Sequence, residues 1–229
     1  MNINLFSFDN NITLSNEYIS ILEIENKKLF SSFIRSFYAV CNGTEAEQKI
    51  LLFDGEDEIS FEKNCEIVID PLGIDFNSKK ISTAITNRLK TICNDEVELW
   101  EKFIGTGDKL GKVVLEILSE LEVDMTINTE WDVARMIKAF SITIPEVASY
   151  THLERILSYI DIISELNIFK IIIFCNLKSL LDYDEIMELY KYSLYKKMPL
   201  LLLESSLTSD ILTYEKKLTI DIEFDEQIQ

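Results

Sequence analysis

The densest group of side chains that could bind a ligand is acidic and lies in the middle of the chain. Its five carboxylates belong to Glu116, Glu120, Glu122, Asp124 and Glu130. Ca²⁺ binds about six to eight oxygens, and oxygens at every second residue of a non-helical segment can converge on one ion. The EF-hand pattern is not met, because Met125 stands where that loop needs glycine. The residues alone therefore favour a solvated acidic surface over a metal site.

Gly105 to Lys112 is the segment that most resembles a phosphate-binding loop. Such a loop uses glycines to let backbone N–H groups converge on phosphate, followed by Lys and Ser or Thr, between a strand and a helix. Here Val113 follows Gly111-Lys112, so the hydroxyl ligand for magnesium is missing, and Thr106 replaces the first glycine. The preceding residues have a helical pattern, so we expect a break in a helix and no nucleotide site.

Other catalytic arrangements are not indicated by the sequence. His152 is the only histidine, and no Gly-x-Ser-x-Gly motif accompanies it, which argues against a Ser-His-Asp or Cys-His arrangement. The strand that ends at Asp70 resembles the strand and acid that hold magnesium in phosphate-loop proteins. Without the phosphate loop, this pattern does not indicate a magnesium site. We therefore expect a protein that binds rather than catalyses.

Net charge restricts what the protein can bind. The chain has 22 Lys and Arg against 40 Asp and Glu, a net charge of −18, which opposes binding to nucleic acid. Cations gathered on one surface, or a divalent cation that neutralises part of the acid, would overcome this. The basic residues occur in small groups, which are Lys27-Lys28, Lys79-Lys80, Lys109 with Lys112, Lys196-Lys197 and Lys216-Lys217.

Composition favours an ordered cytoplasmic protein. The 229 residues are 47% hydrophobic and include only 6 Gly and 3 Pro, which indicates a sizeable core and long regular elements. The longest apolar runs, Ile171–Cys175 and Pro199–Leu203, are far shorter than the about 20 residues that cross a bilayer. The N-terminus has no basic region typical of a signal peptide, and four scattered cysteines favour reduced thiols.

The pattern of apolar residues predicts α/β structure at both ends of the chain and helices in the middle. Strands are expected over 4–8, 18–24, 49–53, 66–69, 170–175 and 199–204, with an edge strand over 218–224. Helices are expected over 27–40, from 78, over 97–121, from 129, from 151 and over 186–195. Thr151 with Glu154, and Asp182 with Glu185, have the spacing of capping boxes. The fold class is α/β, with a head formed by residues 1–75 and 140–229 and a helical insertion, or leg, over 76–139.

Several segments resemble the Csn-two family, the small accessory proteins of type II-A CRISPR adaptation. The most similar is Ile67-Val-Ile-Asp-Pro-Leu-Gly-Ile-Asp-Phe-Asn-Ser78, a strand followed by Gly, Asp and an Asn-Ser helix start. The order of elements from His152 to Glu204 fits too, as do Asn4–Phe8 and Leu51–Asp54. The acidic run Glu120-Leu-Glu-Val-Asp124 falls where the family carries acidic residues.

The resemblance implies a specific assembly and function. Such proteins form a homotetrameric ring from heads similar to RecA-like ATPases and from helical legs, with a degenerate nucleotide site and no hydrolysis. Calcium bound by leg acids holds the legs, which favours a calcium site at the five carboxylates. Lysines line the central hole and bind double-stranded DNA ends without sequence preference. Here the candidate DNA-binding residues are Lys27, Lys28, Lys79, Lys80, Lys109 and Lys112.

The resemblance also implies partners, and alternatives stay open beside it. The ring supports spacer acquisition in antiviral defence together with the CRISPR integrase complex and the RNA-guided effector nuclease. A ring reconciles DNA binding with an acidic chain, because four subunits can pool their cations at the inner wall. The alternatives are a nucleotide-hydrolysing RecA-like ATPase and an acidic protein-interaction scaffold that does not bind DNA.

Overall fold

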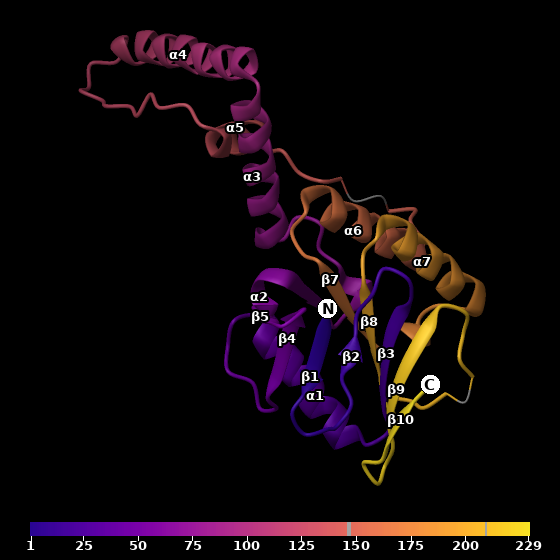
Figure 1. Ribbon diagram of the computed structural model, residues 1–229. Coiled ribbons are helices and arrows are strands. Elements are labelled where there is room, and N and C mark those ends of the chain that lie inside the picture. The colour runs from indigo at the N-terminus through magenta and orange to yellow at the C-terminus, as the bar shows by residue number, and fades with distance from the viewer. Residues whose placement is uncertain (146–147, 209) are drawn as a thin grey trace. The chain divides into compact units, whose positions relative to one another are not determined.

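The computed structural model describes residues 1–145, 148–208 and 210–229, and the chain divides into two compact units (Figure 1). The head unit comprises Met1–Asp75 and Val147–Gln229, and the leg unit comprises Phe76–Glu146. The chain thus leaves the head unit after its first part, forms the leg unit and returns to complete the head. Residues 140–145, which the sequence assigned to the head, lie in the leg unit.

A six-stranded sheet forms the centre of the head unit. Its order is β10 (Glu226–Ile228), β9 (Glu215–Ile220), β3 (Ile19–Ile24), β8 (Leu200–Glu204), β7 (Ile171–Cys175) and β6 (Cys65–Val68). All neighbouring pairs are parallel except β10 with β9. Every residue of β3, β7 and β8 is buried, as expected for parallel strands covered on both faces. Burial on both faces explains why these strands appear in the sequence as continuous apolar runs.

Capping residues define where the head helices begin. The Asn26 side chain accepts hydrogen bonds from the backbone N–H groups of Lys28 and Leu29 at the start of α1 (Lys27–Cys41). The two predicted capping boxes are confirmed at the starts of α6 (His152–Leu166) and α7 (Tyr183–Lys196). The short helices α2 (Phe61–Asn64), η1 (Pro71–Gly73) and η2 (Leu177–Ser179) complete the head. His152 lies exposed in the first turn of α6.

A second, four-stranded antiparallel sheet belongs to the same unit. It has the order β2 (Ile12–Thr13), β1 (Asn2–Leu5), β4 (Ile50–Asp54) and β5 (Asp57–Ile59). The predicted turn at Asp54-Gly55 is confirmed, and Gly55 has a positive φ of 67° that favours glycine. Phe33 and Phe37 of α1 join the residues of both sheets in one buried core.

The described part of the leg unit, residues 76–145, contains three helices: α3 (Lys79–Asp95), α4 (Val97–Ser119) and α5 (Val133–Phe140). The expected helix break at Gly105–Lys112 is wrong, because α4 continues through all three glycines. A helical glycine costs only about 1 kcal/mol relative to alanine, which neighbouring turns and packing offset. A Cβ on Gly107 would overlap Cβ of Trp131, so this glycine lets the chain before α5 lie against α4.

The expected edge strand over 218–224 is also wrong. The strand is β9, which ends at Ile220 and lies inside the sheet between β3 and β10. The alternation that suggested an edge strand comes from Thr219, Asp221 and Glu223, but Thr219 is buried inside the sheet and the two acidic residues lie beyond the end of β9. The true edge strand is β10, which follows a tight turn.

The four cysteines, all within the described residues, are buried and form no disulfide bond. Burial raises the pKa of the Cys65 thiol far above its ordinary value and raises the pKa of Cys175 to about 12, so both thiols stay protonated at neutral pH. Among the described residues, no helix is long and apolar enough to cross a membrane.

Candidate functional site

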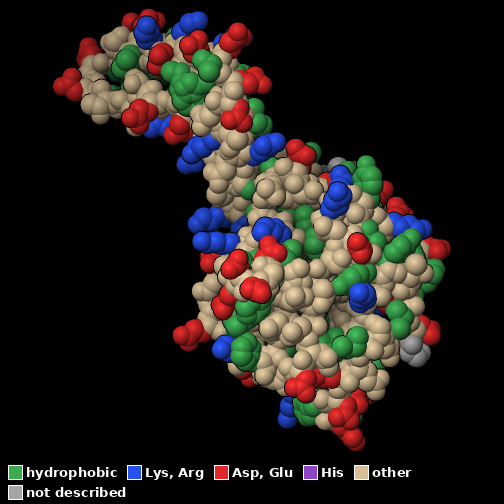
Figure 2. Space-filling model, in the orientation of Figure 1, with side chains coloured by type: hydrophobic (Ala, Val, Ile, Leu, Met, Phe, Trp, Pro, Cys, Tyr) green, Lys and Arg blue, Asp and Glu red, His purple; other side chains and the backbone are tan. Residues whose placement is uncertain are grey.

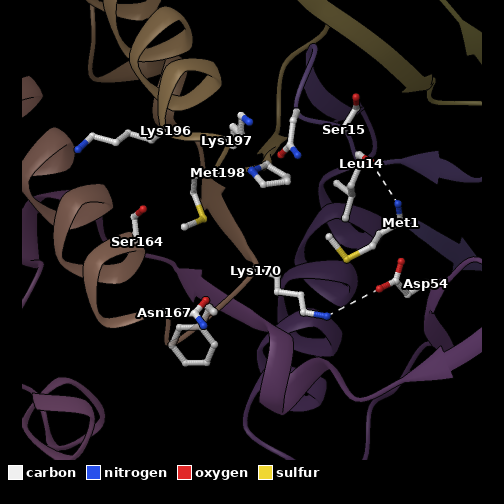
Figure 3. Close-up of a pocket in the computed structure, with 13 residues that line it drawn as sticks. Met1, Leu14, Ser15, Asp54, Ser164, Asn167, Lys170, Lys196, Lys197 and Met198 are labelled. Atoms are coloured by element: carbon white, nitrogen blue, oxygen red, sulfur yellow. Dashed lines mark hydrogen bonds and ion pairs between the residues drawn. The ribbon is translucent and has the colours of Figure 1, made fainter. Parts of the chain in front are cut away.

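Acidic side chains are scattered over the face visible in Figure 2, with small groups of Lys and Arg between them. In the head unit, three lysines surround a pocket of about 470 Å³. This lysine pocket, named for Lys170, Lys196 and Lys197, lies where β7 and β8 begin and where α6 and α7 end (Figure 3). Its other walls come from Met1, Leu14–Asn16, Asp54, Ser164, Asn167, Phe169 and Met198–Pro199.

The three lysines differ in how firmly they are paired. Lys196 Nζ lies 2.6 Å from Asp161 Oδ1, and the hydrogen bond to this carboxylate raises the pKa of Lys196. Lys170 Nζ lies 3.7 Å from Asp54 Oδ2, and both side chains are about half exposed. In Figure 3, Lys196 extends away from Lys170, whereas Lys170 faces Asp54. Lys170 and Lys197 are therefore the lysines best placed to meet a ligand.

Lys197 has a backbone conformation that favours glycine. It caps the C-terminus of α7 with a φ of 54°, and residues at this position are most often Gly or Asn. A cation near a helix C-terminus is stabilised by the helix dipole, which is a structural reason for lysine here. Together with the hydroxyl and amide groups of Ser15, Asn16 and Ser164, the two lysines can hydrogen-bond an anion such as a phosphate.

A network of buried charges lies elsewhere in the head, between the six-stranded sheet and α7. Lys217 Nζ lies 3.1 Å from Glu23 Oε1, with both side chains fully buried. Lys178 Nζ lies 2.7 Å from Glu215 Oε1, and the Tyr190 hydroxyl donates to the same oxygen at 2.7 Å. Each buried carboxylate thus has a cation or a donor, as buried charges require.

Glu204 ends β8 beside this network. Its Oε1 accepts the backbone N–H of Lys178 at 3.1 Å. Burial raises the pKa of Glu204 to about 7, although the Lys178 N–H and ammonium act in the opposite direction. Glu204 is therefore partly protonated at neutral pH, which makes the stability of the head sensitive to pH.

The connection between β3 and α1 is too short for a phosphate loop. Only Glu25 and Asn26 separate the two elements, whereas a phosphate loop needs about eight residues between strand and helix. Asn26 already caps α1 with its side chain. The helical position of Gly105–Lys112 likewise removes the other candidate nucleotide segment.

The five predicted metal ligands do not come together within one chain. All are exposed, with Glu116 in the last turns of α4, Glu120 at its C-cap and the others in the segment before α5. Nowhere in 1–145, 148–208 or 210–229 do three or more acidic, His or Cys side chains form a group that could hold a metal. Arg135 donates to the carbonyls of Asn128 and Glu130, so a guanidinium already occupies two oxygens of this segment.

The six predicted DNA-binding lysines are all exposed but divide between the two units. Lys27 and Lys28 begin α1 in the head, whereas the other four lie on α3 and α4 in the leg. The lysine pocket was not predicted. Its only signal in the sequence is the pair Lys196-Lys197, because Lys170 joins this pair only through the fold.

Comparisons with known proteins agree on one family. A family model described as CRISPR-associated protein (Cas_Csn2) matches residues 43–223. The CRISPR-associated protein Csn2 of Streptococcus agalactiae is 26% identical over 215 residues, which cover 93% of this chain and 92% of the relative. The CRISPR-associated protein Csn2 of Enterococcus faecalis is 27% identical over 202 residues, which cover 86% and 88%.

A solved structure shows the same fold. The crystal structure of Stu0660 of Streptococcus thermophilus aligns with a TM-score of 0.61 and 9% identity, covering 100% of this chain and 76% of that chain. The fold is thus a mixed α/β head with parallel and antiparallel sheets and inserted helices. The chain belongs to the Csn2 family of CRISPR-associated proteins, and the resemblance found in the sequence is confirmed.

Proposed function

We propose that this protein binds double-stranded DNA ends without catalysis, as a homotetrameric ring that supports spacer acquisition in type II-A CRISPR immunity. The observation that carries the proposal is the lysine pocket. A chain with a net charge of −18 places Lys170 and Lys197 beside neutral donors around one cavity. Such an arrangement suits the sugar–phosphate backbone, which carries no sequence information and so permits binding to any duplex.

Two features of the head support a binding role over hydrolysis. The parallel strands have the order β9-β3-β8-β7-β6, which supports placing the head among RecA-like folds. The two-residue connection after β3 leaves no space for the loop that such ATPases use to hold phosphate. We therefore propose that the nucleotide site is degenerate and that the head retains the fold alone.

Assembly and ion binding belong to the same proposal. A ring would add the lysines of four copies around one channel and leave acidic surface outside. Because the five leg carboxylates do not converge within one chain, we expect Ca²⁺ to engage them only in the assembled tetramer. The CRISPR integrase complex and the RNA-guided effector nuclease are the proposed protein partners.

Two pairs of substitutions in the head test the DNA-binding site. Lys170→Gln with Lys197→Gln should weaken binding to a linear duplex and lower the salt dependence, with a slope of log K against log salt smaller by about two. Lys63→Gln with Lys191→Gln changes the charge equally at exposed residues of α2 and α7 and should leave the slope nearly unchanged. Equal slopes for the two double variants would remove the lysine pocket from the DNA interface.

A further inference from the structure

The turn between β9 and β10 presents two apolar side chains to solvent. This hairpin tip comprises residues 221–225, and Ile222 and Phe224 are 61% and 51% exposed. The other three side chains of the tip, those of Asp221, Glu223 and Asp225, are acidic. The tip thus combines apolar contact area with negative charge at the end of an ordered hairpin.

Phe224 occupies a backbone position that does not favour phenylalanine. Its φ is 70°, in the left-handed region where glycine and asparagine are preferred and bulky residues are rare. Asp221 already holds the turn, because its Oδ1 accepts the N–H groups of Glu223 at 2.8 Å and of Asp225 at 3.0 Å. The turn therefore gains nothing from phenylalanine, and the exposed ring itself points to a role in contact.

A groove of about 350 Å³ lies beside the tip. Phe8, Leu29 and Phe224 give it an apolar lining, and Phe8 and Leu29 also pack against the buried core. Glu226 fixes the adjacent loop, since its two carboxylate oxygens accept the N–H groups of Asp9 at 2.7 Å and Asn10 at 2.9 Å. The groove is therefore built on anchored elements.

Carboxylates surround the groove and the tip, and Figure 2 shows acidic and hydrophobic side chains gathered at the end of this hairpin. Glu25 belongs to the same surface, because its Oε2 accepts the N–H of Ile222 at 3.0 Å. The carboxylates are those of Asp9, Glu25, Asp221, Glu223, Asp225 and Glu226. The lysines in these stretches of chain are Lys27, Lys28 and Lys49, so acidic groups predominate.

We propose that the groove and hairpin tip bind a basic segment of another protein, with an apolar residue in the groove and Lys or Arg residues on the acidic rim. Charge selects this occupant. The acidic rim would repel nucleic acid and attract the Lys or Arg side chains of a basic segment. The lysine pocket lies at the opposite end of the parallel strands, where β7 and β8 begin, so a basic partner in the groove and a duplex at the lysine pocket would contact different surfaces.

The test uses a substitution that separates binding from folding. Phe224→Gly relieves the positive φ, so its thermal midpoint should equal or exceed that of the unsubstituted chain. A library of random twelve-residue peptides displayed on phage is selected on the immobilised full-length chain, and the most enriched sequence is synthesised. We expect a peptide with Lys or Arg flanking an apolar residue, bound at least tenfold more weakly by Phe224→Gly and by Ile222→Ser.

Controls make each outcome decisive. Tyr195→Ser removes an aromatic side chain that is 80% exposed on α7 and should leave peptide affinity unchanged. Raising the salt concentration should weaken binding, because the rim contributes charge. No enrichment, an acidic or uncharged consensus, a duplex that displaces the peptide, or equal affinity for Phe224→Gly would each overturn the proposal. Loss of self-association in Phe224→Gly, without loss of peptide binding, would assign the surface to a second copy instead.

Discussion

Lys217 offers the clearest way to test whether the head depends on its buried charges. Lys217→Met replaces the ammonium by an apolar group of similar length. In the native structure this ammonium lies 3.1 Å from Glu23 and donates to the carbonyl of Thr208 at 2.9 Å and that of Asp210 at 3.1 Å. The substitution leaves the Glu23 carboxylate buried, with Lys178 Nζ at 4.0 Å as its remaining lysine partner.

The expected loss of stability follows from burial. Removing one partner of a buried ion pair typically costs about 3–5 kcal/mol, because the other charge stays desolvated. Natural domains have a total stability of only about 5–15 kcal/mol, so this is a large fraction. Thr208 moderates the loss, since its N–H and hydroxyl donate to Glu23 at 3.0 and 2.6 Å. We therefore expect Lys217→Met to lower the free energy of unfolding by about 3 kcal/mol, the low end of this range.

Urea unfolding followed by circular dichroism measures this difference. With a slope of about 2–3 kcal/mol per molar urea for a chain of this size, the midpoint should fall by roughly 1–1.5 M. Glu23→Leu combined with Lys217→Met should recover more than half of the loss, because no unpaired charge remains. The exposed control Lys191→Met should change stability by less than about 0.5 kcal/mol. A Lys217→Met loss below about 1 kcal/mol, or a double variant worse than the single one, would refute the reasoning.

Two further predictions concern pH and calcium. Because the pKa of Glu204 is raised to about 7 in the folded state from an ordinary value of 4.5, its stabilising contribution is complete below pH 4.5 and is lost as pH rises to 7. This loss is roughly 3 kcal/mol, and Glu204→Gln should flatten that part of the urea-midpoint profile; an unchanged profile would contradict the assignment. Glu120→Ala with Asp124→Ala should lower the thermal midpoint in calcium buffer and loosen the tetramer in light scattering. If the carboxylates merely repel one another, stability should instead stay unchanged or rise.

Local signals predicted most elements of the fold correctly. The capping boxes at Thr151 and Asp182 and the Ser78 cap of α3 depend on residues three positions apart, which a sequence displays directly. The apolar runs of β7 and β8 are likewise visible in a short stretch of sequence, and they predicted buried parallel strands. Such signals do not depend on distant parts of the chain.

The errors came from residues whose role depends on tertiary contacts. Thr219 appears solvent-facing in the alternating pattern, yet β3 and β10 lie on either side of its strand and it is buried. Gly107 appears to break a helix, but Trp131 packs where its side chain would be. Long-range contacts of this kind override local propensity.

The candidate site was less predictable than the fold. The lysine pocket joins Lys170 to Lys197 because α6 and α7 end at the same edge of the sheet, which spacing along the chain does not reveal. The predicted leg carboxylates, in contrast, were chosen by their closeness in sequence, and the structure leaves them exposed and separate. Their role as calcium ligands in an assembled tetramer stays a prediction.

Binding to duplexes with and without ends is the measurement that bears most directly on the proposed function. One duplex of fixed sequence is prepared in linear form and as a covalently closed circle, and retention of each is measured at low salt with Ca²⁺ present. We expect a tetramer in light scattering that retains the linear form at least tenfold more tightly and loses it steeply as salt rises. A monomer that retains neither form, or a protein that binds circle and linear duplex equally, would contradict threading of DNA ends through a ring.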